Sequence, residues 1–300
     1  MLKCDSADHT YPIVRYIPRF VPSDMYVRSF SLEWLRHYQT QYDTVSGSKN
    51  SEESFRVKTG MEAGDLEGKL VLEAGSGSGR FMQIARKFGG EVVGLDLSLA
   101  VDGAFRTLGR DPKAHLVQGD ILAPPFKRSS FDFVYSIGVL HHTESAKRGF
   151  LSLTKLLKQQ GRIAIWVYPD GGALMKLMNE IGAIYRKAAS SLDFNTLYWL
   201  CERTQERFPL PGVLAATFDP EPSKTLSRGF LHPRQLVILF FPFYGVAPNK
   251  TWRALDMFDY LAPKYQTKHS WGEVAGWFRE AGLTDIRRLP TAVSYAGTRP

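Results

Sequence analysis

A glycine-rich segment near residue 75 is the stretch of this sequence whose residue types are best suited to hold a ligand. Leu70-Val71-Leu72 predicts a buried strand, and Glu73 precedes glycines at positions 75, 77 and 79. Glycines allow a sharp turn and a close approach of ligand to backbone between a strand and a helix. Arg80 stands where a dinucleotide fingerprint has its third small residue, and Glu73 would repel a phosphate. The segment favours a ligand with an ammonium or sulfonium group over a nicotinamide dinucleotide, with a purely structural turn as the alternative.

Two more acids follow the next two apolar runs. Asp96 comes directly after Val92-Val93-Gly94-Leu95, where a carboxylate is in reach of ribose hydroxyls on a ligand held by the preceding loop. Asp120 follows His115-Leu116-Val117 and could accept a hydrogen bond from an adenine amino group. Taken singly, Asp96 could merely start a helix and Gly119-Asp120 could be only a turn. Together, three consecutive strand ends with fitting chemistry predict a site for a nucleoside-containing ligand.

Two histidines, His141 and His142, follow the fourth apolar run. Histidine titrates near neutral pH, so either one could act as a general base. The alternative is that one of them contacts the ligand or a loop carbonyl and shapes the turn. Lys58 and Arg80 could reach a ligand carboxylate or could be solvated charges, and Lys268 could face an acceptor or anchor its loop.

The elements that must position these residues alternate along the middle of the chain. Short apolar runs separated by amphipathic stretches are typical of a parallel sheet covered by helices. The predicted strands are 70–72, 92–95, 115–117, 131–135 and 163–167. Thr143 is expected to cap the helix before the last of them. Ser270 and Glu273 form a capping-box pair for a final helix, and the runs 284–288 and 292–296 suit an antiparallel hairpin.

We expect three parts in the chain. Residues 69–169 and 270–300 form the core, residues 1–68 an N-terminal cap, and residues 170–269 a helical and aromatic insertion that acts as a substrate lid. Most aromatic residues of the insertion are expected to form its own core. Its tract Leu236–Tyr244 is either buried, in contact with the substrate, or in contact with lipid. The longest apolar run, Leu236–Ala247, is too short to cross a bilayer.

Composition narrows the class of protein. The 300 residues are 44% hydrophobic and 23% charged, which is typical of a globular chain with a full core. Two distant cysteines predict neither a zinc site nor a disulfide framework, so no metal is expected and the cytoplasm is the expected compartment. The net charge is +8, but no dense run of Lys and Arg carries it, so no nucleic-acid partner is expected. The oligomeric state stays open.

Four of these motifs resemble one family. Over residues 69–168 the chain is similar to the class I S-adenosylmethionine-dependent methyltransferases, most of all to the group of ubiquinone- and menaquinone-biosynthesis methyltransferases. The motifs that carry the resemblance are Glu73–Gly79, Gly94–Ser98, Gly119-Asp120 and Ser136–His142. Many relatives have Cys or Thr in the loop where this chain has Ser76 and Ser78, and all of these residues are small enough for the same role.

The resemblance implies a fold, a cofactor and a set of binding residues. The fold is an α/β, Rossmann-like three-layer sandwich with a seven-stranded, mostly parallel sheet whose last strand is antiparallel. The cofactor is S-adenosyl-L-methionine. By resemblance, Glu73 and the loop residues Gly75, Ser76, Gly77 and Gly79 hold the methionine portion, Asp96 holds the ribose, and Asp120 with Ile121 holds the adenine. Ser136, Ile137, Gly138 and Val139 border the sulfonium. Leu97 and Gly119 are the other two expected cofactor-binding residues.

The implied reaction is methyl transfer by in-line displacement, for which alignment and exclusion of water matter most. We expect a small-molecule or lipid-linked acceptor with an oxygen, carbon or nitrogen nucleophile, and the apolar insertion leaves a peripheral membrane contact open. The alternatives are an RNA or protein methyltransferase and a non-catalytic cofactor-binding module. The segment Ser136–Val139 lacks the Asn-Pro-Pro-Tyr-like element often found in enzymes that methylate base amines.

Overall fold

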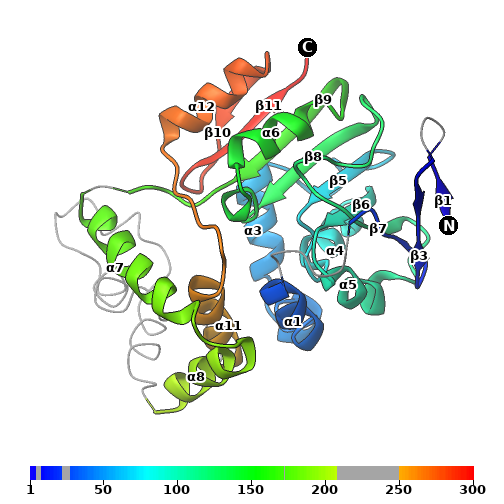
Figure 1. The fold of residues 1–300 in the computed structure, drawn as a ribbon. Coiled ribbons are helices and arrows are strands. Elements are labelled where there is room, and N and C mark those ends of the chain that lie inside the picture. The colour runs from blue at the N-terminus through cyan, green and yellow to red at the C-terminus, as the bar shows by residue number, and fades with distance from the viewer. Residues whose placement is uncertain (5–7, 22–27, 172, 208–249) are drawn as a thin grey trace. The chain divides into compact units, whose positions relative to one another are not determined.

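The computed structural model describes residues 1–4, 8–21, 28–171, 173–207 and 250–300. The chain divides into two compact units: Met1–Pro169 together with Tyr265–Pro300, and Asp170–Lys264. The first unit contains the sheet (Figure 1). Every residue that the sequence proposes for the site also belongs to this unit. The two units are described separately.

A seven-stranded sheet forms the centre of the first unit, with the order β10-β11-β9-β8-β5-β6-β7. The strands are β5 (Leu70–Ala74), β6 (Glu91–Asp96), β7 (Ala114–Gln118), β8 (Phe131–Ile137), β9 (Leu157–Trp166), β10 (Thr284–Arg288) and β11 (Ser294–Thr298). β5 to β9 are parallel, whereas β11 runs antiparallel to both β9 and β10. The predicted mostly parallel sheet with an antiparallel last strand is confirmed, and so is the terminal hairpin.

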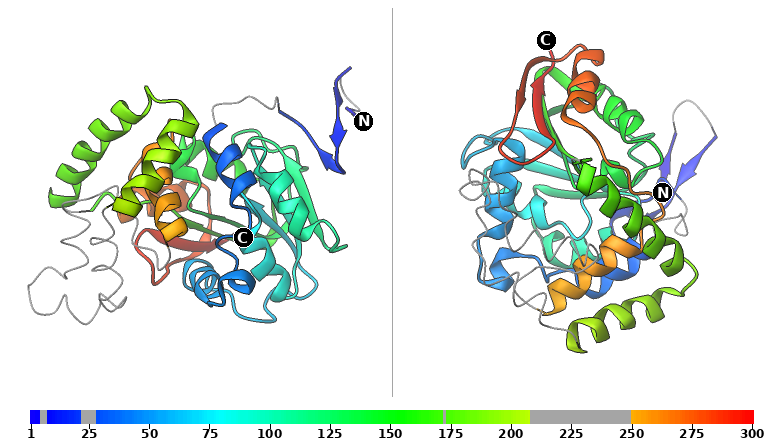
Figure 2. Two further views of the ribbon diagram at one scale, coloured as in Figure 1. Left: turned by 90° about the horizontal axis from the view of Figure 1, so that it is seen from below. Right: turned by 90° about the vertical axis from the view of Figure 1, so that its left-hand side faces the viewer.

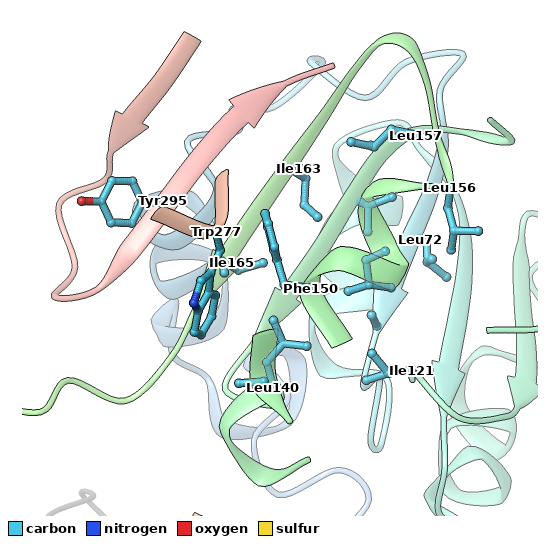
Figure 3. Packing of buried hydrophobic residues seen from close by; sticks show 14 of the residues in the cluster. Leu72, Ile121, Leu140, Phe150, Leu156, Leu157, Ile163, Ile165, Trp277 and Tyr295 are labelled. Carbon is cyan, nitrogen blue, oxygen red and sulfur yellow. The ribbon is translucent and has the colours of Figure 1, made fainter. Parts of the chain in front are cut away.

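Neighbouring residues of a strand point to opposite faces of the sheet. Because apolar residues lie on both faces, helices cover both. Leu72 belongs to the cluster that α6 (Ala146–Thr154) and α12 (Trp271–Glu280) cover with Phe150 and Trp277 (Figure 3). Its neighbour Val71 belongs to the opposite cluster, with Phe81 of α4 (Arg80–Lys87) and residues of α3 (Asn50–Thr59) and α5 (Ala100–Leu108). The result is three layers of helix, sheet and helix, which the turned views make visible (Figure 2).

Capping side chains set where two helices of the core begin. The hydroxyl of Ser270 accepts a hydrogen bond from the Glu273 backbone N–H, so α12 begins where the capping-box pattern predicted. The predicted cap of α6 is wrong by two residues: Ser145 is the N-cap, and its hydroxyl accepts from the Arg148 N–H. Thr143 instead follows the 3-10 turn Leu140–His142 directly and donates its hydroxyl proton to the Leu140 carbonyl of that turn.

In the described residues before β5 there are two small sheets and three helices. β1 (Leu2–Lys3) pairs with β2 (Thr10–Tyr11), and β3 (Ile13–Val14) pairs with β4 (Ile17–Pro18). The helices are α1 (Arg28–Arg36), α2 (Asp43–Ser46) and α3. Arg19 ties this segment to the core, because its guanidinium pairs with Asp102 of α5 at 2.7 Å and donates to the Gln118 side chain at 3.1 Å.

The second unit contains α7 (Ala173–Ala189), α8 (Phe194–Arg207) and α11 (Lys250–Leu261). Among its described residues, a core cluster joins α7, α8 and α11 through side chains that include Ala189, Tyr198, Cys201 and Phe258. A Cβ at Gly182 of α7 would overlap the hydroxyl of Tyr260, so glycine permits that close approach. Phe258 is buried, as expected of an internal core, but 51% of Trp199 is exposed. The apolar tract Leu236–Tyr244 lies outside the described residues.

None of the helices within the described ranges is long and apolar enough to span a membrane.

Candidate functional site

The loop that joins β5 to α4 can be built only with glycine at its tightest points. Gly75, Gly77 and Gly79 have φ angles of +87°, +50° and +85°, which residues other than glycine rarely adopt. A Cβ at Gly75 would also overlap the side chain of Val139, which follows β8. The Ser136 hydroxyl of β8 donates to the Ala74 carbonyl at 2.8 Å. The structure therefore holds the loop directly against the end of β8.

Asp96 connects the same loop to the end of β6. One carboxylate oxygen accepts from the Gly77 N–H at 2.7 Å, and the other accepts from the N–H and hydroxyl of Ser98 at 2.8 and 2.6 Å. Burial raises the pKa of Asp96 above its usual value, although these hydrogen bonds oppose the shift. The side chain remains partly exposed at the sheet edge. Asp96 thus lies where a ligand on the loop would meet it.

Glu73 lies one residue before the end of β5 and is almost completely buried, with 2% of its surface exposed. The Tyr135 hydroxyl of β8 donates to its carboxylate at 3.0 Å. Burial raises the pKa of Glu73 well above its usual value, and the nearby charge of Asp96 adds to the shift. A cation placed beside Glu73 would favour the ionised form, so this group suits a ligand with a positive charge.

The end of β7 completes a row of three neighbouring strand ends. Asp96 stands opposite Gln118 in the register of β6 and β7, and the Gly119 N–H donates to the Asp96 carbonyl at 2.9 Å. Asp120 is partly exposed, and its side chain accepts from the Leu122 N–H at 2.8 Å, so it also forms the turn that the alternative interpretation expected. Ile121 is buried in the core cluster, and the Leu97 carbonyl accepts from the Gln118 side chain at 3.0 Å.

The end of β8 turns away from the sheet at glycine. Ser136 and Ile137 are the last residues of the strand, and Gly138 follows with a φ of +79°. The Gly138 N–H donates to the carbonyl of Trp166, the last residue of β9, at 3.0 Å. The structure therefore brings the segment expected to border the sulfonium next to the ends of β5 and β9.

The two histidines have different environments. His141 is fully buried and stacks on the Tyr168 ring with centroids 3.7 Å apart, and its Nδ1 accepts from the Tyr168 N–H at 3.3 Å. Burial, followed by the charge of His142, lowers the pKa of His141 well below its usual value. His142 is only partly buried, and its Nδ1 lies 2.9 Å from the Tyr265 carbonyl. Because a carbonyl can only accept, Nδ1 of His142 carries the proton and Nε2 becomes the basic nitrogen.

Residues before α3 also contact the glycine loop, and the sequence did not indicate them. The Tyr42 hydroxyl donates to the Ser78 carbonyl at 2.6 Å, and the Arg80 guanidinium donates to the Gln41 side chain, also at 2.6 Å. A Cβ at Gly77 would lie 3.7 Å from the indole nitrogen of Trp34 on α1. The aromatic character of residues 30–42 was visible in the sequence, but its position against the loop was not.

Within the described residues, no group of three or more His, Cys, Asp or Glu side chains is placed to hold a metal ion.

Comparison with known proteins places the chain in a family. A family described as a methyltransferase domain matches residues 72–165. The demethylmenaquinone methyltransferase of Lactococcus lactis is 30% identical over 198 residues, which are 60% of this chain and 76% of that protein. This chain belongs to the class I S-adenosylmethionine-dependent methyltransferases, with S-adenosylmethionine as the cofactor that the family implies.

Other relatives carry different names and are covered only in part. The tRNA U34 carboxymethyltransferase of Proteus mirabilis is 37% identical over 105 residues, 33% of this chain and 32% of that protein. The sterol 24-C-methyltransferase ERG6 of Saccharomyces cerevisiae is 29% identical over 147 residues, 47% of this chain and 37% of that protein. For seven of the first eight curated relatives the chain spans between 26% and 62% of their length.

Among solved structures, an S-adenosylmethionine-dependent methyltransferase from Mesorhizobium loti is 18% identical, with a TM-score of 0.46. The match covers 83% of this chain and 98% of that one.

The polar groups of the loop fit this cofactor. The Ser76 hydroxyl is buried and, within the described part of the chain, has no hydrogen-bond partner. Such a group costs about 1–3 kcal/mol, which a polar ligand atom would offset. Glu73 can balance a positive charge and Asp96 can accept from hydroxyls. These three groups would hold the cofactor, with the backbone of Gly75–Gly79 in contact with it.

Proposed function

We propose that this chain transfers a methyl group from S-adenosylmethionine to a small-molecule or lipid-linked acceptor with an oxygen, carbon or nitrogen nucleophile. One observation carries the proposal: Glu73, the glycine loop and Asp96 meet at one edge of the sheet, with the loop N–H of Gly77 2.7 Å from the Asp96 carboxylate. Acids and glycines in this arrangement suit a cationic nucleoside ligand and would disfavour a pyrophosphate.

The chain's own residues have three tasks in this reaction. When bound, S-adenosylmethionine supplies an electrophilic methyl group on a sulfonium. Glu73 balances positive charge, and Asp96 orients the ribose from the end of β6. Gly138 and Val139 close the loop from the side of β8 and help to exclude water, since a Cβ at Gly75 would already overlap Val139.

His142 is the residue proposed to accept the proton of an acceptor hydroxyl or acidic carbon. Its Nδ1–H is held by the Tyr265 carbonyl at 2.9 Å, so the ring presents Nε2 as the base. His141 is proposed as a positioning residue, because its Nδ1 already accepts from the Tyr168 N–H and its pKa is lowered by burial. The sequence could not distinguish the two histidines.

The apolar and aromatic character of the insertion supports a small-molecule or lipid-linked acceptor, with residues 170–269 as the proposed lid. Peripheral membrane contact stays a prediction on the same grounds, and a cytoplasmic location stays a prediction from the two distant cysteines. An RNA acceptor is the second candidate, because curated relatives include tRNA U34 carboxymethyltransferases. The absence of a dense basic run in the sequence argues against it.

Binding and label transfer test this proposal. Calorimetry with S-adenosylmethionine, S-adenosylhomocysteine and NAD should give binding of the first two and none of NAD. Methyl-labelled cofactor is then incubated with lipid extract, aromatic metabolites and total RNA in separate reactions. Label in the lipid or metabolite fraction is the expected result. Label only in RNA would contradict a small-molecule or lipid-linked acceptor and support an RNA acceptor. Binding without transfer to any fraction would support a non-catalytic cofactor-binding module.

A further inference from the structure

A third histidine near the end of the sheet, His269, has a polar neighbour at both nitrogens of its ring. Nδ1 lies 3.0 Å from a carboxylate oxygen of Glu273 in the first turn of α12, and Nε2 lies 2.8 Å from the Thr267 hydroxyl. Only 7% of the surface of His269 is exposed, and its ring lies at 73° to the Trp277 ring with centroids 4.9 Å apart. A buried ring with a partner on each nitrogen is held in one orientation, so it can fix the position of its neighbours.

The segment Tyr265–His269 is attached to the residues that follow β8 and β9. The Thr267 N–H donates to the His141 carbonyl at 2.9 Å, and the His269 N–H donates to the Tyr168 carbonyl at 2.9 Å. The Thr267 hydroxyl lies 3.2 Å from the same His141 carbonyl, between it and the His269 ring. The first four residues of the segment belong to no helix or strand. The contacts of Thr267 and His269 therefore determine where the segment lies.

The same segment contains the carbonyl that contacts the proposed base. His142 Nδ1 lies 2.9 Å from the Tyr265 carbonyl, and Tyr265 precedes Thr267 by only two residues. Because a carbonyl only accepts, this bond places the proton of His142 on Nδ1 and leaves Nε2 basic. A displaced carbonyl would let the proton move between the two ring nitrogens. The population of the reactive tautomer would then fall.

We propose that His269, together with Thr267 and Glu273, is a positioning residue that sets the tautomer of His142 for methyl transfer. This inference rests on the proposed function, in which His142 is the base. Glu273 holds the His269 ring, the ring holds the Thr267 hydroxyl, and Thr267 holds the backbone that carries the Tyr265 carbonyl. His269 thus acts on the reaction through the backbone and not by contact with the reacting atoms.

The tautomer of His142 can be measured by NMR on the full chain, without an acceptor. Long-range proton–nitrogen spectra of isotopically labelled histidine, at about pH 8.5, show which nitrogen of each neutral ring carries the proton. The signals lost in His142→Gln are those of His142, and we expect its proton on Nδ1 in the wild type. Thr267→Val removes a hydroxyl at an exposed residue. It should lower the ratio of the Nδ1–H to the Nε2–H form by about fivefold, the effect of one hydrogen bond.

Conservative variants separate positioning from a general loss of structure. Thr267→Ser keeps the hydroxyl and should retain the wild-type ratio, whereas His269→Phe keeps a ring beside Trp277 without its nitrogens and should lower the ratio as Thr267→Val does. Thr154→Val is the matched control, because it removes a hydroxyl that donates to the Leu151 carbonyl of α6 at 3.0 Å. In label transfer, Thr267→Val should reduce kcat by about fivefold and change the KM for S-adenosylmethionine less than twofold.

An unchanged His142 ratio in Thr267→Val, or in a folded His269→Phe, would overturn the inference. An equal loss in Thr267→Ser and Thr267→Val, or a wild-type His142 with its proton on Nε2, would also overturn it. Calorimetry with S-adenosylhomocysteine tests the proposed function separately, since a wild-type chain that does not bind this nucleoside would contradict methyl transfer. The histidine spectra need no cofactor and would still decide whether His269 positions His142.

Discussion

The carboxyl edge of the sheet has an acidic half and a basic half. The acidic half, at the ends of β5, β6 and β7, contains Glu73, Asp96 and Asp120 around the glycine loop. The basic half, beyond the ends of β8 and β9, contains His141, His142, Lys58 and Lys268 around Trp166 and Tyr168. The carboxylates of the first half suit a cationic donor, whereas the second half contains the histidine that we propose as the base.

The two halves also differ in how their polar groups are held. In the acidic half, consecutive βα turns hold the carboxylates, as the bond between Asp96 and Gly77 shows. In the basic half, contacts between distant segments hold the side chains: Tyr265 binds His142, and the Tyr168 backbone binds His141. Substitutions in the acidic half should therefore affect cofactor binding, and those in the basic half should affect turnover.

The largest effect is expected from His142→Ala. Removal of a general base slows proton transfer by about 10²- to 10⁴-fold, while binding of S-adenosylhomocysteine should change less than twofold. The measurement is the initial rate of label transfer to the acceptor found in the extract screen, beside calorimetry. His115→Ala, at an exposed histidine paired with Glu91 on β6, is the matched control. A fully active His142→Ala would remove the base assignment and, with it, the functional division of the two halves.

The next effect concerns Asp96→Ala. Loss of charge-assisted hydrogen bonds to ribose should weaken S-adenosylhomocysteine binding by about 10- to 100-fold. Circular dichroism should show a folded chain, since Asp96 lies at the end of its strand. Asp111→Ala, at an acid paired with Arg86 away from the loop, is the control and should leave affinity unchanged. Unaltered affinity in Asp96→Ala would contradict the ribose assignment.

A smaller effect should appear in the pH dependence of stability through Glu73. Burial raises the pKa of Glu73 in the folded chain, so between its ordinary value of 4.5 and the raised value the folded state holds a proton that the unfolded state lacks. Its contribution to stability is therefore full at low pH and is lost as pH rises through that window. The Tm of the wild type minus the Tm of Glu73→Gln should therefore decrease as pH rises. Glu67→Gln, at an exposed residue, should follow the wild type; parallel profiles for Glu73→Gln would refute a raised pKa.

The smallest effect is expected from Tyr42→Phe, which sharpens the link between the N-terminal segment and the acidic half. The variant loses the 2.6 Å hydrogen bond to the Ser78 carbonyl, worth about 1 kcal/mol. Tm should fall by about 2–4 °C in a domain of about 200 residues, with a few-fold loss of cofactor affinity. Tyr38→Phe, on the same segment, serves as the comparison. If affinity is unchanged while Tm falls, Tyr42 supports the fold without shaping the loop.

Much of the acidic half could be predicted from the sequence because its geometry is local. A strand that ends in glycines must turn there, and consecutive parallel strands place their ends at the same edge. The register of β5, β6 and β7 brought Glu73, Asp96 and Asp120 to that edge in the expected order. The cap of α6 was predicted two residues too early for an equally local reason. The 3-10 turn Leu140–His142 comes between Gly138 and Ser145 and moves the start of the helix along the chain.

The sequence by itself determined the parallel core, the glycine loop and the identity of the acids that line it, because strands and turns depend on residues that are close together in the chain. Only the tertiary structure decided which histidine is buried, that Tyr42 and Trp34 reach the loop, and that Lys58 meets the end of β9. These contacts join segments up to more than a hundred residues apart, and no spacing rule encodes them. Their partners are selected by packing and by charge once the sheet has formed.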